Sequence, residues 1–415
     1  MYEGEVWIMK WLNDAGVTAP KGFKAAGIHA GIKKQKLDLG LIVADKPCSV
    51  AAVYTTNVVQ AGCIKVSKAH LENNIGQVVI VNSGNANACT PNGEADALAT
   101  CEKVATELKI KAEDVVVAST GVIGQPLPLA RIKKAIPKLV EKLDTGLDSD
   151  DQIATSIMTT DLIEKQTACQ IEIDGKEILI AGIAKGSGMI HPNMATMLGF
   201  VTTDVAITPE LLQKAISDIT EPTFNSISVD GDTSTNDMNV VMASGSAGNK
   251  LIDSEDENYE IFKNALQEVC LVLAKKIAED GEGATKLMTC VVEGCKTGAD
   301  AKALSMSVNS SSLVKTAMTG ADANWGRILC AMGYSGVAFD PSAVDVMFKS
   351  IAGEITVCMD GVGLEFDEEF ATKILSEKEI TIDIKIKTAH HHESWTTYGC
   401  NLTNEYVRIN GDYRS

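Results

Sequence analysis

The residues best suited to carry out chemistry gather in one segment, residues 184–200, which contains Lys185, Ser187, His191 and Thr196. Glycines on both sides of Ser187 allow the backbone to approach a ligand closely, because glycine has no side chain in the way. A glycine turn between two strands has the same composition. Taken alone, these residues therefore favour neither a ligand site nor a plain turn.

Two further segments combine polar groups with glycines. Residues 118–124 directly follow a valine-rich run and include Thr120 and Gly121. A turn there would expose a hydroxyl and backbone N–H groups, which are the parts of an oxyanion hole; a plain strand-to-helix turn is the alternative. Residues 280–286 follow a helical pattern and place Glu282 between two glycines, which suits a helix C-terminus as well as a substrate contact.

Two patterns that suggest metal sites are better explained as loops, so we expect no bound metal. Residues 229–237 have calcium-like carboxylate spacing, but the twelve-residue loop with a terminal Glu is absent, which favours a polar turn. His390–His392 are adjacent, and successive side chains of a strand alternate between its faces, so we expect an exposed hairpin. Trp325 and Arg327 are expected to pack in the core.

Short Val- and Ile-rich runs predict strands, and apolar residues at helical spacing predict helices. The predicted strands are 39–43, 49–55, 77–81 and 114–118, with a hairpin over 171–183 turning at Asp174-Gly175 and mostly strands over 379–409. The predicted helices are 94–108, 209–219 and 259–279, the first with one face formed by Leu98, Cys101, Val104, Ala105 and Leu108. This mixed order predicts a layered α/β fold.

Composition and charge exclude several classes of protein. The chain has 415 residues, 45% of them hydrophobic, and a net charge of −18, so neither a disordered chain nor a nucleic-acid binder is expected. No apolar run approaches the roughly 20 residues of a membrane span, and the first residues lack a signal-peptide pattern. The eleven scattered cysteines are typical of reduced thiols. We therefore expect a cytoplasmic protein, with Met9 as an alternative start to Met1.

Together these segments resemble the glutamate N-acetyltransferase family of arginine biosynthesis, also called ornithine acetyltransferase. The resemblance runs from about residue 16 to the last residue. It is carried by residues 16–31, 82–90, 119–121, 158–161, 185–199, 229–237, 280–286, 316–327 and 398–415. The chain departs from the family at Tyr398–Leu402, where Trp-Gly-Cys-Asp-Leu is more usual, and at its histidine triplet.

The resemblance implies a precursor that cuts itself between Ala195 and Thr196. The pieces would be an α chain, residues 1–195, and a β chain, residues 196–415, headed by Thr196 as the nucleophile. A threonine hydroxyl needs a nearby base, and a free α-amine with a pKa of about 7.7–8.0 can accept a proton at neutral pH. Before cleavage that nitrogen is an amide, so the cut itself would create the base.

The resemblance also implies a reaction in which the acetyl group of N-acetylornithine passes to glutamate through an acetyl ester on Thr196. Thr120 and Gly121 would hold the oxyanion. The implied substrate contacts are Thr159, Lys185, Thr196, Glu282, Asn410 and Ser415, with Thr160 open as an alternative to Thr159. Lys185 would pair with a carboxylate and Glu282 with the ornithine ammonium.

The implied fold is a layered α-β-β-α sandwich, similar in shape to N-terminal nucleophile hydrolases but with its own topology. No cofactor is implied, and no nucleic-acid or membrane partner. The α and β chains would assemble into a heterotetramer or a larger complex. Acetyl-CoA as a second acetyl donor is left open, since no residue decides it. The alternatives are an N-terminal nucleophile aminopeptidase or amidohydrolase, in which water takes the acyl group, and a non-enzymatic binding protein with a glycine-rich pocket.

Overall fold

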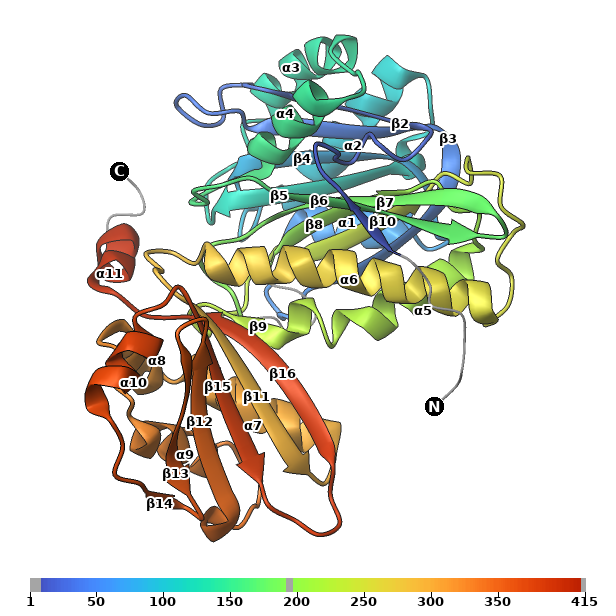
Figure 1. Ribbon diagram of the computed structural model, residues 1–415. Helices are drawn as coiled ribbons and strands as arrows, with labels where there is room; N and C mark the ends of the chain where they lie inside the picture. Colours follow the sequence, from blue (N-terminus) through green and yellow to red (C-terminus); the bar gives the residue numbers. More distant parts are fainter. Residues whose placement is uncertain (1–8, 192–196, 412–415) are drawn as a thin grey trace. The chain divides into compact units, whose positions relative to one another are not determined.

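The computed structural model describes residues 9–191 and 197–411 (Figure 1). The described residues form two compact units. The first comprises those within Met1–Gly186, Pro192–Asn225 and Thr233–Ala274, and the second those within Ser187–His191, Ser226–Asp232 and Lys275–Ser415.

The first unit is built on a nine-stranded sheet in the order β1-β6-β7-β8-β10-β3-β4-β5, with β2 also paired to β3. The strands are β1 (Lys10–Leu12), β2 (Phe23–Ile28), β3 (Leu39–Tyr54), β4 (Ile75–Asn85), β5 (Val115–Val122), β6 (Lys165–Ile173), β7 (Lys176–Lys185), β8 (Leu198–Thr203) and β10 (Met238–Ala243). The first part of β3 pairs with β2 and its last part with β10. A register shift between Val43 and Cys48, which spans exposed residues 45–47, separates these two parts.

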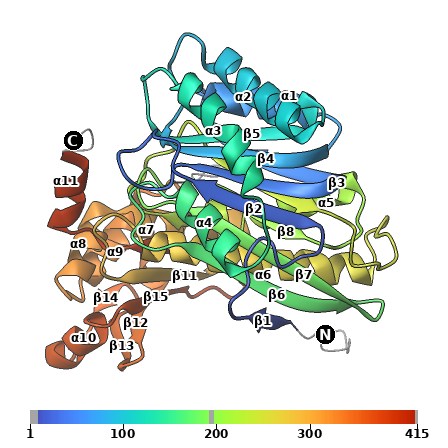
Figure 2. The same ribbon diagram turned by 90° about the horizontal axis from the view of Figure 1, so that it is seen from above.

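Helices pack against several strands of this sheet. They are α1 (Gly62–His70), α2 (Gly93–Leu108), α3 (Leu129–Glu141), α4 (Leu147–Ile157), α5 (Pro209–Thr220) and α6 (Glu257–Glu279), of which residues 275–279 belong to the second unit, with the short 3-10 turns η1 (Ala112–Asp114) and η2 (Phe224–Ser226). Contacts join α1 and α2 to β5, and α4 to β2 and β3 (Figure 2). A Cβ on Gly182 of β7 would lie 2.9 Å from Leu273 of α6, so the absence of a side chain there lets α6 approach the sheet closely.

The second unit has a seven-stranded sheet in the order β14-β13-β12-β15-β11-β16-β9. Its strands are β9 (Ile227–Ser228), β11 (Leu287–Cys295), β12 (Val344–Ser350), β13 (Gly353–Met359), β14 (Val362–Gly363), β15 (Glu379–Ile386) and β16 (Glu393–Cys400). Its helices are α7 (Gly298–Ser310), α8 (Ser312–Thr319), α9 (Trp325–Gly333), α10 (Glu368–Leu375) and α11 (Asn404–Gly411), with η3 (Pro341–Ala343) as a 3-10 turn. Helix α7 packs on β11 and β16 (Figure 1). The inner sides of these elements form a continuous apolar core that includes Leu304, Phe348 and Ile382.

The mixed α/β class predicted from the sequence is confirmed, with two sheets and helices packed on each. The hairpin turn at Asp174-Gly175 is also confirmed, and both residues have positive φ, as a two-residue hairpin turn requires. The helices predicted at 94–108, 209–219 and 259–279 correspond to α2, α5 and α6.

Several predicted elements are wrong in detail. The strands 39–43 and 49–55 are one strand, β3, because a bulge carries the chain past Pro47 without ending it. Leu98 is 40% exposed, whereas Ala97 is buried in its place on α2. The region 379–409, expected to be mostly strand, contains β15 and β16, but residues 404–411 form the helix α11. His390–His392 do not sit on a two-stranded hairpin, because β11 lies between β15 and β16, although the three side chains are exposed as expected.

Candidate active site

The predicted oxyanion residues Thr120 and Gly121 lie within β5, not in a turn after it as the sequence suggested. The strand continues to Val122 and pairs in parallel with β4, where the register becomes irregular opposite Gly84 and Asn85. Gly121 has φ of 128°, and a Cβ there would lie 2.5 Å from the backbone carbon of Gly84. Only glycine fits this position, because both the backbone conformation and the neighbouring strand exclude a side chain.

Lys185, the last residue of β7, is buried and lies against Thr120. Its exposed fraction is 8%, and its Nζ is 3.5 Å from Thr120 Oγ1. In the hairpin register Lys185 pairs with Leu198 of β8, and Leu198 pairs in turn with Met238 of β10. The sheet therefore places Lys185 beside Leu198, the first residue of β8. In the sequence, Leu198 follows the predicted nucleophile Thr196 by two positions.

Asp161 joins the predicted substrate residue Thr159 to the loop after Lys185. Its carboxylate accepts hydrogen bonds from the N–H groups of Thr159 (2.8 Å) and Gly186 (2.7 Å) and forms a buried ion pair with Lys165 (2.7 Å). Burial opposes ionisation of this carboxyl, but the charges of Lys185 and Lys165 hold its pKa well below the usual range. Asp161 is thus a permanent anion at neutral pH.

Asn236 ties the ends of β4 and β5 together. Its Nδ2 donates to the carbonyl oxygen of Ser119 (2.8 Å) and to that of Ala86, and its Oδ1 accepts from the Thr235 hydroxyl. Asn236 is 4% exposed, so these bonds are shielded from water and are costly to lose. The segment 229–237, expected to be a polar turn, is one, and this end of it supports the backbone beside Thr120.

In the second unit, Glu282 is bound to Asn410. Asn410 Nδ2 donates to Glu282 Oε2 at 2.6 Å, and Glu282 is 6% exposed. The Glu282 N–H donates to the Ser187 carbonyl (2.8 Å), while the Ser187 hydroxyl donates to the carbonyl of Asp280 (2.7 Å). The turn after α6 is therefore fastened to the loop that carries Ser187, and a Cβ on Gly188 would lie 2.3 Å from Glu282 Oε2.

Asp230 holds the next part of that loop. Its carboxylate accepts from the N–H groups of Met189 (2.6 Å) and Ile190 (2.9 Å) and from the Tyr406 hydroxyl (3.2 Å). His191 Nδ1 lies 3.0 Å from Ser228 Oγ. Burial, and secondarily Lys302, lower the pKa of His191 although Asp230 and Asp232 oppose this, which favours a neutral imidazole.

The structure brings the predicted site residues together in two groups. Thr120, Gly121, Thr159 and Lys185 belong to the first unit, and Glu282 and Asn410 to the second. The loop of Gly186 and Ser187 joins the two groups through the covalent chain. Ala195, Thr196 and Ser415 lie outside the described residues, so their roles stay predictions.

Sequence reasoning missed Asp161, Lys165, Asp230 and Asn236 as site-building residues. One of them was within reach, because a hairpin turning at Asp174-Gly175 pairs Lys165 with Ala184, next to Lys185. Asp230, Asn236 and, through Gly186, Asp161 bond to backbone groups distant in the sequence, and no local pattern signals such contacts.

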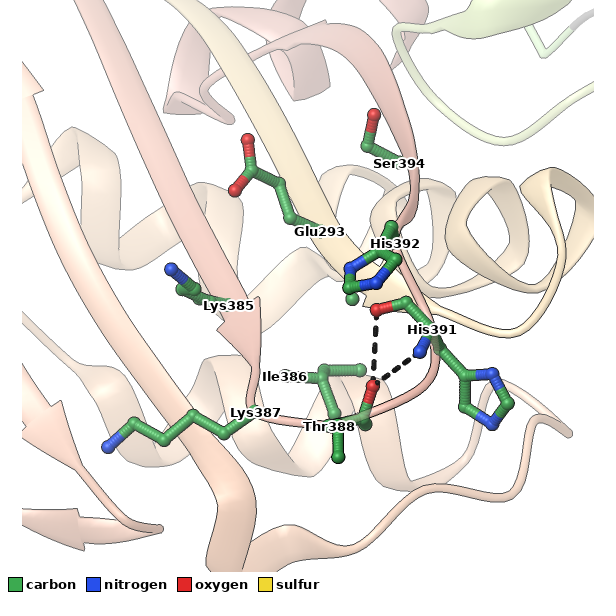
Figure 3. Close-up of a pocket in the computed structure, with 10 residues that line it drawn as sticks. Glu293, Lys385, Ile386, Lys387, Thr388, His391, His392 and Ser394 are labelled. Carbon is green, nitrogen blue, oxygen red and sulfur yellow. Dashed lines mark hydrogen bonds between the residues drawn. The ribbon is translucent and has the colours of Figure 1, made fainter.

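A separate cavity borders the histidine loop, and it does not include the predicted site. Its volume is about 630 Å³, and Figure 3 shows Lys385, Thr388, His391 and His392 among its lining residues. The Thr388 hydroxyl bonds to the backbone of His391 at both N and O, each at 3.1 Å. Across the part of the chain that the structure describes, no group of three or more His, Cys, Asp or Glu side chains is placed to hold a metal.

The described residues contain free thiols and no helix that could span a membrane. The eleven cysteines are free, and only Cys89 and Cys330 are exposed. None of the described helices is both long enough and apolar enough to cross a bilayer.

Comparison with known proteins gives a consistent result over the whole length. A model of the ArgJ family matches residues 24–415. Arginine biosynthesis bifunctional protein ArgJ 1 of Clostridium acetobutylicum is 46% identical over 409 residues, which cover 98% of this chain and 99% of that protein.

Two solved structures are also similar. Arginine biosynthesis bifunctional protein ArgJ from Bacillus halodurans is 44% identical with a TM-score of 0.45, over 46% of this chain and 100% of that one. Ornithine acetyltransferase from Mycobacterium tuberculosis, complexed with ornithine, is 39% identical with a TM-score of 0.43, over 45% of this chain and 100% of that one.

Proposed function

The chain belongs to the ArgJ family, and from this premise we propose how its residues move an acetyl group from N-acetylornithine to glutamate. It is an acetyltransferase of arginine biosynthesis. The feature of the described residues that best supports the proposed mechanism is the buried Lys185 ammonium beside Thr120 Oγ1. A cation there suits the carboxylate that acetylornithine and glutamate share.

In the proposed mechanism the chain first cuts itself between Ala195 and Thr196, and Thr196 becomes the nucleophile. Its hydroxyl attacks the acetyl carbonyl of N-acetylornithine, and its own α-amine takes the proton. The oxyanion is held by Thr120 and Gly121, and ornithine leaves with a proton on its amine. Glutamate then attacks the acetyl ester on Thr196, which yields N-acetylglutamate and the free enzyme.

In this proposal each charged group of the substrate is recognised by a protein side chain of opposite charge. Lys185 pairs with the α-carboxylate of either substrate, and Thr159 lies on the same buried Asp161 network. Glu282 pairs with the ornithine ammonium. Asn410 donates to Glu282 Oε2, and in this proposal the other carboxylate oxygen, Oε1, accepts from the ammonium. Ser415 completes the substrate contacts in this proposal.

The rival chemistry is hydrolysis, in which water instead of glutamate takes the acetyl group from Thr196. Purified protein with N-acetylornithine should release ornithine much faster when glutamate is present, with N-acetylglutamate formed in equal amount. Ornithine release at the same rate without glutamate would make the chain a hydrolase. The same assay with acetyl-CoA and glutamate decides whether this chain also uses acetyl-CoA.

Self-cleavage has its own test. The intact mass of purified protein should correspond to two pieces, residues 1–195 and 196–415, which together would assemble as a heterotetramer or larger complex. A single mass for residues 1–415 in fully active protein would remove the cleavage step, and a cut at another bond would remove Thr196 from the nucleophile's role.

A further inference from the structure

The buried Asp161 carboxylate has an unusual position among the predicted substrate contacts. It accepts from the N–H of Thr159 and from the N–H of Gly186, and so joins the backbone of a predicted substrate contact to that of the residue after Lys185. Asp161 is 2% exposed and its partner Lys165 1% exposed. A charged pair so completely removed from water adds little net stability, because desolvation of two charges offsets most of their attraction.

Two ammonium groups share this one carboxylate. Lys165 forms the direct ion pair at 2.7 Å, and the charge of Lys185 also acts strongly on Asp161. The hairpin brings the backbones of the two lysines close, since Lys165 at the start of β6 pairs with Ala184, the residue before Lys185 on β7, although neighbouring side chains of a strand start on opposite faces. With both lysines protonated, this trio carries one net positive charge.

We propose that Asp161 is a positioning residue for Lys185 and Thr159, and that Lys165 balances the Asp161 charge so that Lys185 can serve the substrate carboxylate. This inference rests on the proposed function. Without Lys165, Asp161 and Lys185 would form a neutral pair, and an incoming carboxylate would have to compete with Asp161 for the same ammonium.

Other ionisable groups face this trio from neighbouring segments. Lys33 is next to it, on the 29–38 loop, where burial lowers the pKa of Lys33 to about 8 and Lys36 and Lys185 act in the same direction against Asp38 and Asp161. From the segment before β10, Asp237 also feels the Lys185 charge, but burial raises its pKa well above the usual value. Asp237 therefore tends to be neutral, and Asp161 provides the negative charge at this point.

The decisive variant is Lys165→Met, which removes the balancing charge and keeps an unbranched side chain. We expect the KM values for N-acetylornithine and for glutamate to rise about tenfold each, while kcat stays within about threefold. Lys103→Met is the matched control, because Lys103 forms an ion pair with Glu107 at the same i,i+4 spacing on α2, and its KM values should not change.

The double variant Asp161→Asn with Lys165→Met distinguishes charge balance from general disruption. Asn keeps an oxygen for the Gly186 N–H but loses the bond from the Thr159 N–H, which used the other carboxylate oxygen, and Lys185 becomes the one cation of the trio. Both KM values should then return to within about threefold of the wild type. Unchanged KM values in folded Lys165→Met, or a double variant no better than Lys165→Met, would overturn the inference.

Should Lys165→Met fail to fold, the pH dependence of KM in Asp161→Asn and in the double variant still tests the proposed charge balance. In Asp161→Asn two ammonium groups face a neutral amide and lower each other's pKa, so KM should begin to rise at a lower pH than in the wild type. In the double variant with Lys165→Met, the rise in KM should shift back towards the pH seen in the wild type. Identical pH profiles for Asp161→Asn and the double variant would contradict the inference. If the wild type transfers no acetyl group, the proposed function fails; if it does and these patterns are absent, only this inference fails.

Discussion

Gly188→Ala is expected to disable substrate recognition without unfolding the protein. A Cβ at position 188 would lie 2.3, 2.4 and 2.6 Å from the three carboxyl atoms of Glu282, whereas ordinary contacts begin at 3.4 Å. The carboxylate must therefore move by about 1 Å. Because it is the mobile end of a side chain, the fold can accommodate the shift, but the bond to Asn410 Nδ2, now 2.6 Å, cannot keep its geometry.

The size of the effect follows from the role proposed for Glu282. A displacement of 1 Å in a group that orients substrate can cost on the order of 10²-fold, or about 2.7 kcal/mol of transition-state stabilisation. The kcat/KM for N-acetylornithine should fall by roughly that factor. The reaction of the acetylated enzyme with glutamate should change less, since glutamate has no side-chain ammonium.

Steady-state kinetics with each substrate varied separately, together with thermal melting, test this prediction. Gly333→Ala is the control, because a Cβ there meets nothing within 4 Å. A double-mutant cycle with Glu282→Ala adds a second check, since Gly188→Ala should have little further effect once the carboxylate is gone. The reasoning is refuted by a Gly188→Ala enzyme that is within twofold of wild type, or by an undiminished further loss in the Glu282→Ala background.

Three further outcomes are expected. Thr196→Ala should leave one uncut chain, which intact mass would show, and should have no transfer activity. A normally cut Thr196→Ala product would exclude Thr196 as the residue that performs the cleavage. Thr120→Ala should lower kcat at least tenfold, towards the ~10²–10³ typical of a lost oxyanion donor; a raised KM with unchanged kcat would make Thr120 a binding residue. Glu282→Gln should raise the KM for N-acetylornithine more than that for glutamate, whereas Lys185→Met should raise both, and equal losses in Glu282→Gln would remove its charge-reading role.

The sequence predicts elements well where local physics decides them. The Asp174-Gly175 turn needs positive φ at two positions, and Asp and Gly tolerate it. The start of α5 follows equally directly, because Thr208 caps the helix and Pro209 is its first residue. Where packing decides, prediction fails: Leu98 is exposed and Ala97 buried on α2, although leucine is the larger apolar residue.

For the site, residue types in the sequence suggested the chemistry, but not which strands and helices hold the reactive residues in place. Thr120 and Gly121 were expected in a turn, yet Gly121 is needed because β4 passes within 2.5 Å of its missing Cβ. That distance depends on strand pairing between segments about 37 residues apart, which no local pattern encodes. The contact of Asn410 with Glu282 likewise depends on α11, a helix in a region expected to be strand.

The position of β8 bears on the proposed self-cleavage, because it determines what would happen to the two pieces after a cut between Ala195 and Thr196. All six residues of β8 are buried, and the strand is hydrogen-bonded to β7 on one side and β10 on the other. Strand β10 is in turn paired with β3, so segments from before and after residue 195 alternate across the sheet. After such a cut the pieces would be interleaved, and neither could leave without breaking the hydrogen bonds between the strands of the sheet. An affinity tag on either piece should recover both in equal amounts under native conditions, and only a denaturant should part them.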